Sequence, residues 1–194
     1  ICRLFLFNLQ SRKLQPGVYP KWSRMHLRTW CIRRMEIFVI RPLTAVVRST
    51  RIFGWALRRL GARVGRNLQC AHEVELLGPL GLLQIDDHVA IQTGASISTT
   101  RWVGSELHLG PVHLQSGCKI GMRAGVANDV TVGQGSWITP LASVLDDVGA
   151  GEIWEGAPAR ATGGYAELNR SRNHRPSRLP AWLLETTNLA MQMV

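Results

Sequence analysis

Histidines and paired aspartates are the side chains of the central sequence that could carry proton-transfer chemistry. They are His72, His88, His108, His113, the pair Asp86 and Asp87, and the pair Asp146 and Asp147. A histidine can take and give a proton near neutral pH, and a carboxylate can orient it. His108, His113 and Cys118 offer metal-ligand chemistry, but their spacing matches no zinc motif, so we expect no metal. For each histidine, a surface residue at a corner of the chain is the simpler interpretation.

Basic charge is concentrated at one end of the 194-residue chain, whose net charge is +10. Residues 1–66 contain 15 Lys or Arg and one acidic residue, Glu36, whereas residues 67–194 contain 8 basic and 12 acidic residues. A partner that attracts cations, either nucleic acid or an anionic membrane, is therefore expected only at the N-terminal third. Apolar residues make up 45% of the chain, which predicts a folded domain with a buried core.

The cysteines and the chain ends predict the setting of the protein. The cysteines show no C-x-x-C spacing, so we expect neither a disulfide framework nor a zinc cluster, and a reducing, cytosol-facing setting. The sequence begins with Ile and shows no signal peptide, and we interpret it as a fragment or a cut domain. The sequence contains no apolar run of 18 or more residues, so we expect no complete membrane span. Each end could continue into a span or form an ordinary amphipathic helix.

An aliphatic residue returns at every sixth position along the middle of the chain. The fold of this part must position the histidines and aspartates named above. The main register comprises Leu114, Ile120, Val126, Val132, Ile138 and Val144, preceded by Ile85, Ile91 and Ile97 and a weaker start at Val64 and Cys70. The residue four positions later in each unit is small or β-branched. A period of six is that of neither a simple helix nor a simple strand, and it indicates an internal repeat.

A parallel β-helix satisfies this pattern, with one short strand and one corner for each unit. Three units make a triangular coil of about 18 residues, in which the aliphatic side chains point inward and stack from coil to coil. Hydrogen bonds between coils leave exposed strand edges only at the two ends. Gly121, Gly133 and Gly135 are expected to supply corner conformations that a Cβ disfavours. The aspartate pairs are expected to form hydrogen bonds at corners.

The register breaks between Ile97 and Leu114, which are not separated by a multiple of six residues. Residues 98–111 must therefore leave the prism as a loop and return, and such insertions often carry function. Residues 75–83 disturb the phase near the start, and the segment that ends at Arg160 closes the last coil. The predicted parts are a basic, membrane-proximal helical segment over 1–60, the repeat over 61–160, and a linker with a C-terminal helix over 161–194.

Residues 21–60 mix tryptophan and arginine on predicted helices. This combination is typical of helices at a membrane surface, and the positive-inside rule places it at the cytoplasmic face. A solvated helix face is a second interpretation, and nucleic-acid binding is a third, without a recognition motif to support it. We favour an anionic membrane surface as the partner and expect no nucleic acid.

The repeat, closed by G-A-P-A-R at residues 156–160, resembles the hexapeptide acyltransferase superfamily. The resemblance implies an all-β fold, a left-handed parallel β-helix of hexapeptide repeats, here with flanking α-helical segments. This handedness is an exception to the right-handed crossover rule. Members commonly form trimers with sites between adjacent prisms. They carry acyl groups from coenzyme A or carrier-protein thioesters to hydroxyls or amines.

Further stretches resemble the C-terminal region of nonribosomal peptide synthetases of the ε-poly-lysine synthetase type. In chain order they are LQPGVYPKW (14–22), LRTW (27–30), LRRLGARVGRN (57–67), LGPVHL (109–114) and IWEGAPAR (153–160). The resemblance covers about residues 14–160. It implies adenylation and carrier domains in the same chain or complex, and membrane helices that alternate with tandem β-helix domains. Those domains are thought to join aminoacyl units.

The resemblance also implies candidate site residues. His113 and His88 are candidate general bases, because these acyltransferases usually use a histidine near a coil corner or loop. Candidates for contact with acetyl-CoA or with the phosphopantetheine-bound thioester of a carrier protein are Lys119, Gly156, Pro158, Ala159 and Arg160. Within residues 98–111, Thr100 stands where the synthetases often have a histidine, and Val103 stands where they have a glutamate.

Three functions remain open from the sequence. The chain could be an acyl or aminoacyl transferase-like module of a membrane-associated nonribosomal peptide synthetase. It could also be a coenzyme A-dependent O- or N-acetyltransferase, which the synthetase-type flanks disfavour. It could be a non-catalytic scaffold for a tandem catalytic copy, which Thr100 and Val103 favour. We predict the first, with carrier and adenylation domains as partners, and with tandem copies or a homotrimer.

Overall fold

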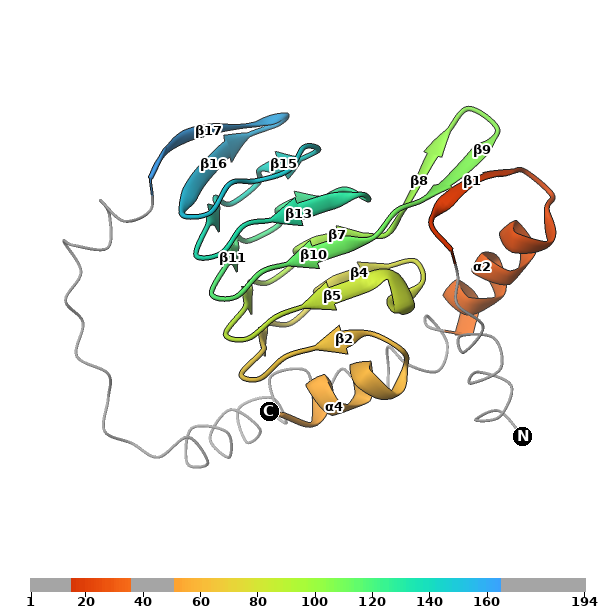
Figure 1. Ribbon diagram of the computed structural model, residues 1–194, viewed down its shortest axis with the longest axis horizontal. Coiled ribbons are helices and arrows are strands. Elements are labelled where there is room, and N and C mark those ends of the chain that lie inside the picture. The colour runs from red at the N-terminus through yellow and green to blue at the C-terminus, as the bar shows by residue number, and fades with distance from the viewer. Residues whose placement is uncertain (1–14, 36–50, 165–194) are drawn as a thin grey trace.

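The computed structural model describes residues 15–35 and 51–164, most of which form three parallel sheets wound around one axis (Figure 1). The first sheet contains β2 (Arg63–Val64), β5 (Leu83–Ile85), β10 (Val112–Leu114) and β13 (Val130–Val132). The second contains β3 (Gln69–Cys70), β6 (Ala90–Ile91), β11 (Lys119–Ile120), β14 (Trp137–Ile138), β16 (Glu152–Gly156) and β17 (Ala159–Gly164). The third contains β4 (Glu75–Leu77), β7 (Ser96–Ser98), β12 (Gly125–Val126) and β15 (Ser143–Val144).

Each coil contributes one strand to each sheet in turn, so strands pair in parallel with the coil above and below. Ile120 pairs with Ile138, and Val126 pairs with Val144, each 18 positions further along the chain. The prediction of parallel sheets built from a six-residue repeat is thus confirmed. Strands of two or three residues are too short to be stable alone, and the stack of coils stabilises them together.

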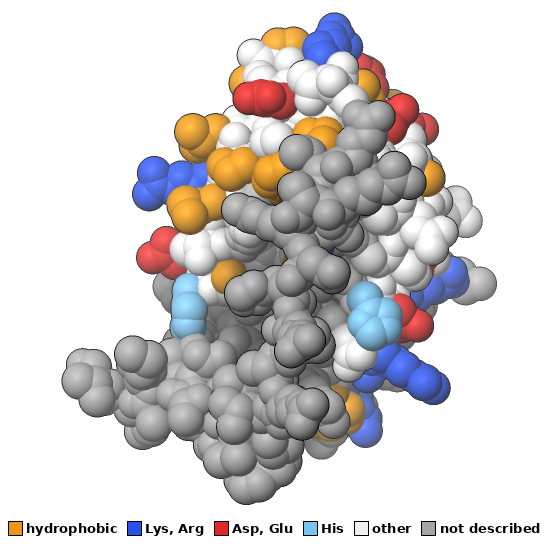
Figure 2. All heavy atoms as spheres, turned by 90° about the vertical axis from the view of Figure 1, so that its left-hand side faces the viewer, with side chains coloured by type: hydrophobic (Ala, Val, Ile, Leu, Met, Phe, Trp, Pro, Cys, Tyr) orange, Lys and Arg blue, Asp and Glu red, His pale blue; other side chains and the backbone are white. Residues whose placement is uncertain are grey.

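Residues with positive φ form the corners between the strands of the first and second sheets. They are Asn67, His88, Gly117, Gly135 and Gly151, one in each successive coil. Such a conformation costs an ordinary L-residue about 1–2 kcal/mol, which glycine avoids and asparagine tolerates. At the turns of the stack, hydrophobic, acidic, basic and histidine side chains all reach the surface (Figure 2).

Two of the three glycines predicted at corners have a different physical role. Gly135 has a φ of 65°, as expected, but Gly121 and Gly133 are not among the positive-φ residues. A Cβ on Gly121 would lie 2.5 Å from the backbone nitrogen of Pro140, and a Cβ on Gly133 would lie 2.5 Å from that of Ala150. These two glycines are required because the backbone of the next coil approaches closely.

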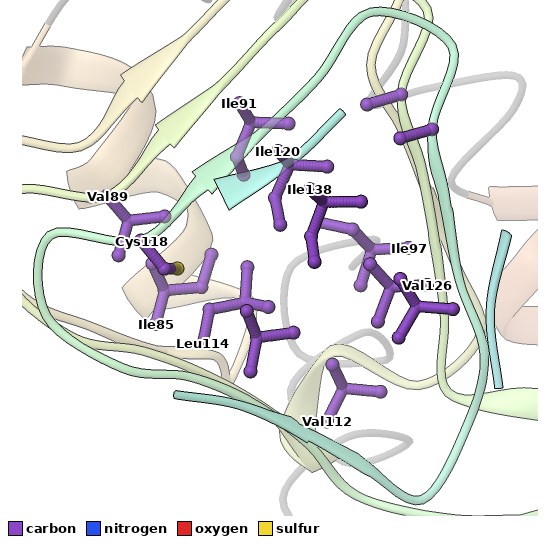
Figure 3. Packing of buried hydrophobic residues seen from close by; sticks show 14 of the residues in the cluster. Ile85, Val89, Ile91, Ile97, Val112, Leu114, Cys118, Ile120, Val126 and Ile138 are labelled. Carbon is purple, nitrogen blue, oxygen red and sulfur yellow. The ribbon is translucent and has the colours of Figure 1, made fainter. Parts of the chain in front are cut away.

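The aliphatic positions of the repeat fill the inside of the prism. Figure 3 shows Ile91, Ile120 and Ile138 in one inward ladder, and none of them is more than 3% exposed. The small residues four positions later are buried as well, among them Cys118 and Ala124. Burying one aliphatic side chain stabilises a fold by roughly 1.5–3 kcal/mol, so the ladders supply the main stabilisation of the coils.

Both breaks in the register are insertions at the corner that leads from the third sheet to the first. The earlier one contains the short 3₁₀ helix η2 (Leu80–Leu82), between β4 and β5. The later one leaves the prism as predicted, but it is a β-hairpin of β8 (Thr100–Val103) and β9 (Glu106–Leu109) rather than a loop. The strand β1 (Gly17–Pro20) pairs antiparallel with β9 and completes a separate three-stranded sheet.

Two helices flank the prism, α2 (Arg24–Met35) beside the hairpin and α4 (Arg51–Arg59) below the first coil (Figure 1). The His26 ring of α2 meets the Trp102 ring of β8 edge-on, with 5.1 Å between centroids. Within the described ranges, neither helix is long and apolar enough to cross a membrane. Of the linker and C-terminal helix predicted over 161–194, residues 161–164 are the end of β17. The rest, like the possible spans at the ends, lies outside the described residues.

The two ends of the stack are closed differently. At the base, the Arg58 guanidinium of α4 donates hydrogen bonds to the carbonyl oxygens of Val64 at 2.7 Å and Gly65 at 2.5 Å. At the other end, β16 pairs with the last coil in parallel and with β17 antiparallel. This hairpin covers that end of the stack.

Candidate functional site

The outer face of the first sheet places His113 next to a carboxylate. Val112 and Leu114 of β10 are buried in the prism, so the alternation of the strand turns His113 outward. Coil stacking pairs His113 with Gln84 of β5, and Asp86 follows this strand directly. The His113 Nε2 and Asp86 Oδ2 atoms are 2.9 Å apart.

The hydrogen bonds around Asp86 assign the tautomer of His113. A carboxylate only accepts hydrogen bonds, so Nε2 of His113 carries the proton that it donates to Asp86. The Gln84 amide nitrogen donates to the other Asp86 oxygen at 3.3 Å. The same nitrogen lies 3.1 Å from His113 Nε2, which in this tautomer is an approach of two donors. Nδ1 is therefore the nitrogen of His113 that can accept a proton.

A pocket of about 330 Å³ opens beside this pair. It is lined by Arg63, Val64, Gly65, Gln84, Ile85, Asp86, Asp87 and Ser116. The side chains of His113 and Asp86 are each about one-third exposed, at 32% and 33%. The arrangement joins a partly solvent-accessible base, a carboxylate that orients it, and a pocket with both a cationic and a hydroxyl donor. Asp86 lines the pocket, and His113 is linked to it through the hydrogen bond to Asp86. A histidine with a carboxylate partner can take a proton from a nucleophile.

His88, the other predicted base, occupies a corner and has a structural role there. Its φ is 59°, and its Nδ1 lies 3.4 Å from the Asn67 amide nitrogen of the coil below. No carboxylate partner is recorded for it in the described part of the chain. The geometry therefore favours His113 over His88 as a base.

The other sequence candidates for proton or metal chemistry lie apart from this pair. His108 of β9 is 3.8 Å from Glu106, and its Nε2 is buried without a hydrogen-bond partner in the described structure. Cys118 lies inside the prism, where burial, with a smaller contribution from Asp86, raises the pKa of its thiol to about 12. A protonated, buried thiol is neither a nucleophile nor a metal ligand near neutral pH. In the described ranges no group of three His, Cys, Asp or Glu residues is placed to hold a metal ion.

The residues predicted to contact a coenzyme lie on the second sheet. Lys119 is exposed on β11, in the same coil as His113. Gly156 to Arg160 form the turn of the β16–β17 hairpin, where Ala159 is 2% exposed and the Ala157–Pro158 peptide bond is cis. The Arg160 guanidinium lies 3.5 Å from Asp146, and both side chains are largely exposed. The structure thus unites the four residues of the turn but places them on a different sheet from His113.

The hairpin carries the two positions at which the chain differs from the synthetases. Thr100 is half-buried at the base of β8, opposite Leu109, and its carbonyl oxygen accepts a hydrogen bond from the Ser98 hydroxyl at 2.6 Å. Val103 is 47% exposed near the hairpin tip. Neither side chain can act as a base. His108 lies in the hairpin but is 3.8 Å from Glu106, whereas His113, four positions after Leu109, is 2.9 Å from Asp86.

Sequence reasoning assigned Asp86 to corner hydrogen bonding and gave Gln84, Arg63 and Ser116 no role. The insertion hid the relation, because Leu114 pairs with Ile85, 29 positions earlier, instead of the usual 18. If residues 98–111 are set aside as an insertion at one corner, the six-residue unit of Ile85 aligns with that of Leu114. Gln84 and His113 then occupy equivalent positions, each one residue before an inward aliphatic side chain.

Comparisons with known proteins agree with this fold. No family model matches the chain. The delta-poly-L-ornithine synthetase of Acinetobacter baumannii is 30% identical over 149 residues, which are 76% of this chain but only 11% of that relative.

Two solved structures share the architecture of the coils. A galactoside acetyltransferase in complex with coenzyme A has a TM-score of 0.58 and 14% identity, and the match covers 85% of this chain and 94% of that one. A hexapeptide-repeat containing acetyltransferase from Vibrio cholerae O1 biovar eltor, complexed with acetyl coenzyme A, has a TM-score of 0.54 and 16% identity, and covers 74% and 90%. With its six-residue repeat and its stack of parallel coils, the chain shares the fold of these two acetyltransferases.

Proposed function

We propose that the chain is an acyl or aminoacyl transferase-like module of a membrane-associated nonribosomal peptide synthetase, with His113 as its general base. The observation that carries the proposal is the His113–Asp86 pair beside a pocket on the outer face of the first sheet. Similarity to part of a poly-L-ornithine synthetase supports a reaction that joins aminoacyl units.

In the proposed reaction an amine attacks the carbonyl carbon of a thioester. The new C–N bond forms, the C–S bond breaks, and the thiol leaves. Nδ1 of His113 takes the proton that the attacking nitrogen loses and returns it to the departing sulfur. Asp86 stabilises the imidazolium that forms in between, as a carboxylate does in other histidine-based sites. Arg63 and Ser116 are the donors at the pocket that can stabilise the developing oxyanion.

The proposed donor is an aminoacyl thioester on the phosphopantetheine arm of a carrier protein, with acetyl-CoA as the second candidate. Two proteins of the same fold are complexes with coenzyme A or acetyl coenzyme A, which supports a pantetheine-containing donor. Lys119 and the turn residues 156–160 remain the predicted contacts of the donor. We further propose a left-handed coil, carrier and adenylation domains as partners, and the cytoplasmic face of a membrane as the location.

Contact with a second prism, in a tandem copy or a homotrimer, is part of the same proposal. Met122, Leu141 and Leu145 are exposed by 51%, 69% and 48%, respectively. Met122 and Leu141 stand on successive coils, joined by a hydrogen bond from the Leu141 N–H to the Met122 carbonyl oxygen at 2.9 Å. A second prism would remove these apolar side chains from water.

The test is amide formation by the purified chain with two donors, an aminoacyl-pantetheine thioester and acetyl-CoA, and an amino-acid amide as acceptor. Loss of a general base lowers such a rate by about 10²–10⁴-fold, so we expect this loss for His113→Ala and a smaller loss for Asp86→Asn. His88→Asn is the matched control, because asparagine tolerates the positive φ of that corner. Asn67 already stands at the equivalent corner of the preceding coil. Mass spectrometry of the product separates the two donors.

A non-catalytic scaffold is the second candidate, favoured by Thr100 and Val103 at the hairpin. It predicts no amide with either donor, and no effect of His113→Ala on product formation when the chain is part of a synthetase. A wild-type rate in the folded His113→Ala chain would exclude His113 as the base. Activity with acetyl-CoA alone would instead favour the free-standing acetyltransferase.

A further inference from the structure

The two helices that flank the prism carry the same outward-facing sequence pattern. Leu27, Trp30 and Arg34 of α2 are spaced as aliphatic-x-x-Trp-x-x-x-Arg, and Ile52, Trp55 and Arg59 of α4 repeat this spacing. Residues separated by three and four positions lie on one face of a helix. We call these two sets of side chains the Trp–Arg faces.

On α2 the Trp–Arg face is the face that points away from the protein. Leu27 is 56% exposed and Trp30 is 51% exposed, whereas Thr29 is 7% exposed and packs inward. The Arg34 guanidinium lies over the Trp30 ring, 5.3 Å from its centroid. A helix of a water-soluble domain normally buries its leucine and tryptophan and exposes its threonine. The helix α2 therefore exposes the apolar side chains that such a helix normally buries.

On α4 the protein uses one apolar face and leaves a second one outside. Phe53 and Leu57 are 5% and 3% exposed and cover the first coil. Ile52 and Trp55 on the opposite side are 56% and 52% exposed, and the Arg59 guanidinium lies 5.2 Å from the Trp55 ring centroid. The inward face already accounts for the attachment of α4 to the prism. The Trp–Arg face is thus not needed for this attachment, and its Ile52 and Trp55 side chains are exposed in the described structure.

We propose that the two Trp–Arg faces bind the surface of an anionic lipid bilayer. The aliphatic and indole groups would enter the boundary between headgroups and acyl chains, and the arginines would meet the lipid phosphates. This inference rests on the membrane association proposed above, and it assigns that association to six residues. The helices would lie in the plane of the surface, since neither α2 nor α4, within the residues that the structure describes, is long and apolar enough to cross a bilayer.

Charge identifies the partner as lipid. Neither helix contains an acidic residue, and residues 1–66 as a whole contain 15 basic residues and one acid. A protein partner for such a face would need a matching acidic groove with pockets for two indoles. A bilayer with anionic headgroups supplies negative charge and apolar volume together, without a shaped partner.

The experiment measures sedimentation of the full chain with vesicles of phosphatidylcholine alone and with vesicles that contain one-quarter phosphatidylglycerol. Each arginine near an anionic surface contributes about 1 kcal/mol, or about fivefold in affinity. We expect the Arg34→Gln/Arg59→Gln chain to bind anionic vesicles about 25-fold more weakly, and the Trp30→Ala/Trp55→Ala chain at least about tenfold more weakly. Arg34→Lys/Arg59→Lys keeps the charge and most of the binding.

The matched control is Val18→Ala/Val103→Ala, which removes apolar side chains of similar exposure, 52% and 47%, from β1 and β8. We expect this chain to bind as the wild type does. If all variants bind equally, the membrane association stands but the Trp–Arg faces do not carry it. If the wild type binds neither vesicle, both fail, while the amide-forming assay still decides the transferase proposal. If the tryptophan variant loses only self-association in gel filtration, the faces are a protein interface and the inference is wrong.

Discussion

At the scale of single residues, the partner of a histidine decides what that histidine can do. His113 donates from Nε2 to a carboxylate, which leaves Nδ1 as the nitrogen that can accept a proton. His88 has no such contact recorded and stands at a position where three other coils use glycine. Both are histidines near coil corners in the sequence, which is why the sequence alone could not rank them.

Cys118 gives a prediction about pH. Burial raises the pKa of its thiol from 9.0 to about 12, so the folded chain holds this proton more tightly than the unfolded chain does. The resulting stability is complete below about pH 9 and is lost as the pH rises towards 12. The Cys118→Ala chain should therefore lose less of its melting temperature than the wild type between about pH 8 and pH 10.

Calorimetry at both pH values checks this expectation, with Cys31→Ala as the control because Cys31 is only partly buried. An unchanged pH dependence in Cys118→Ala would show that the thiol stays protonated in both states or that other groups dominate. Alanine is a suitable replacement, since Ala124 and Ala142 occupy the equivalent inward position in two other units.

At the scale of elements, the glycines of the coils fall into two physical classes that mutation can separate. Gly121 lies against the backbone of the next coil, which cannot move without shifting that coil. Gly135 has a positive φ, but nothing lies within 4 Å of where its Cβ would be. We expect Gly135→Ala to cost about 1–2 kcal/mol of unfolding free energy, and Gly121→Ala to cost more than about 3 kcal/mol.

Urea unfolding of the two variants measures the difference. Both variants replace glycine with alanine, so the effect of this substitution on the entropy of the unfolded chain is the same in both and cancels in the comparison. Equal losses would mean that conformation, as the sequence suggested, and not close approach sets the need for glycine at Gly121.

The six-residue pattern predicted the strands that repeat and could not predict those that do not. Each inward aliphatic residue from Ile85 to Val144 was assigned correctly, because one physical requirement recurs at a fixed spacing. The pairing of β1 with β9 joins segments that are distant in sequence and share no period. The antiparallel β16–β17 hairpin likewise depends on where the stack ends. The His113–Asp86 pair needed the insertion to be counted before the coils could be aligned.

At the scale of the whole molecule, the prism is a stack in which each coil contacts only its neighbours. Such a stack unfolds from its ends, so the elements that close the ends determine how stable the whole is. The base is closed by α4, whose Phe53 is 5% exposed. Phe53→Ala should lower the unfolding free energy by about 3–5 kcal/mol, whereas Ile52→Ala, at a 56% exposed neighbour, should change it by less than about 0.5 kcal/mol.

Thermal unfolding followed by circular dichroism distinguishes the two cases. If α4 closes the stack, Phe53→Ala lowers the melting temperature of the β signal and not only of the helical signal. A loss confined to the helical signal would show that the coils are stable without α4. Ile52→Ala reports whether an outward residue of the same helix contributes in solution.

Both insertions leave the stack at the corner between the third and first sheets, and the coils on either side remain in register. Residues inserted at this corner do not change how the coils stack. Evolution can therefore lengthen, shorten or exchange the hairpin as a cassette, and with it the residues beside β10, while the scaffold below stays the same. In the proposed transferase, grafting the hairpin of one relative into another would be a route to altered acceptor choice that leaves folding intact.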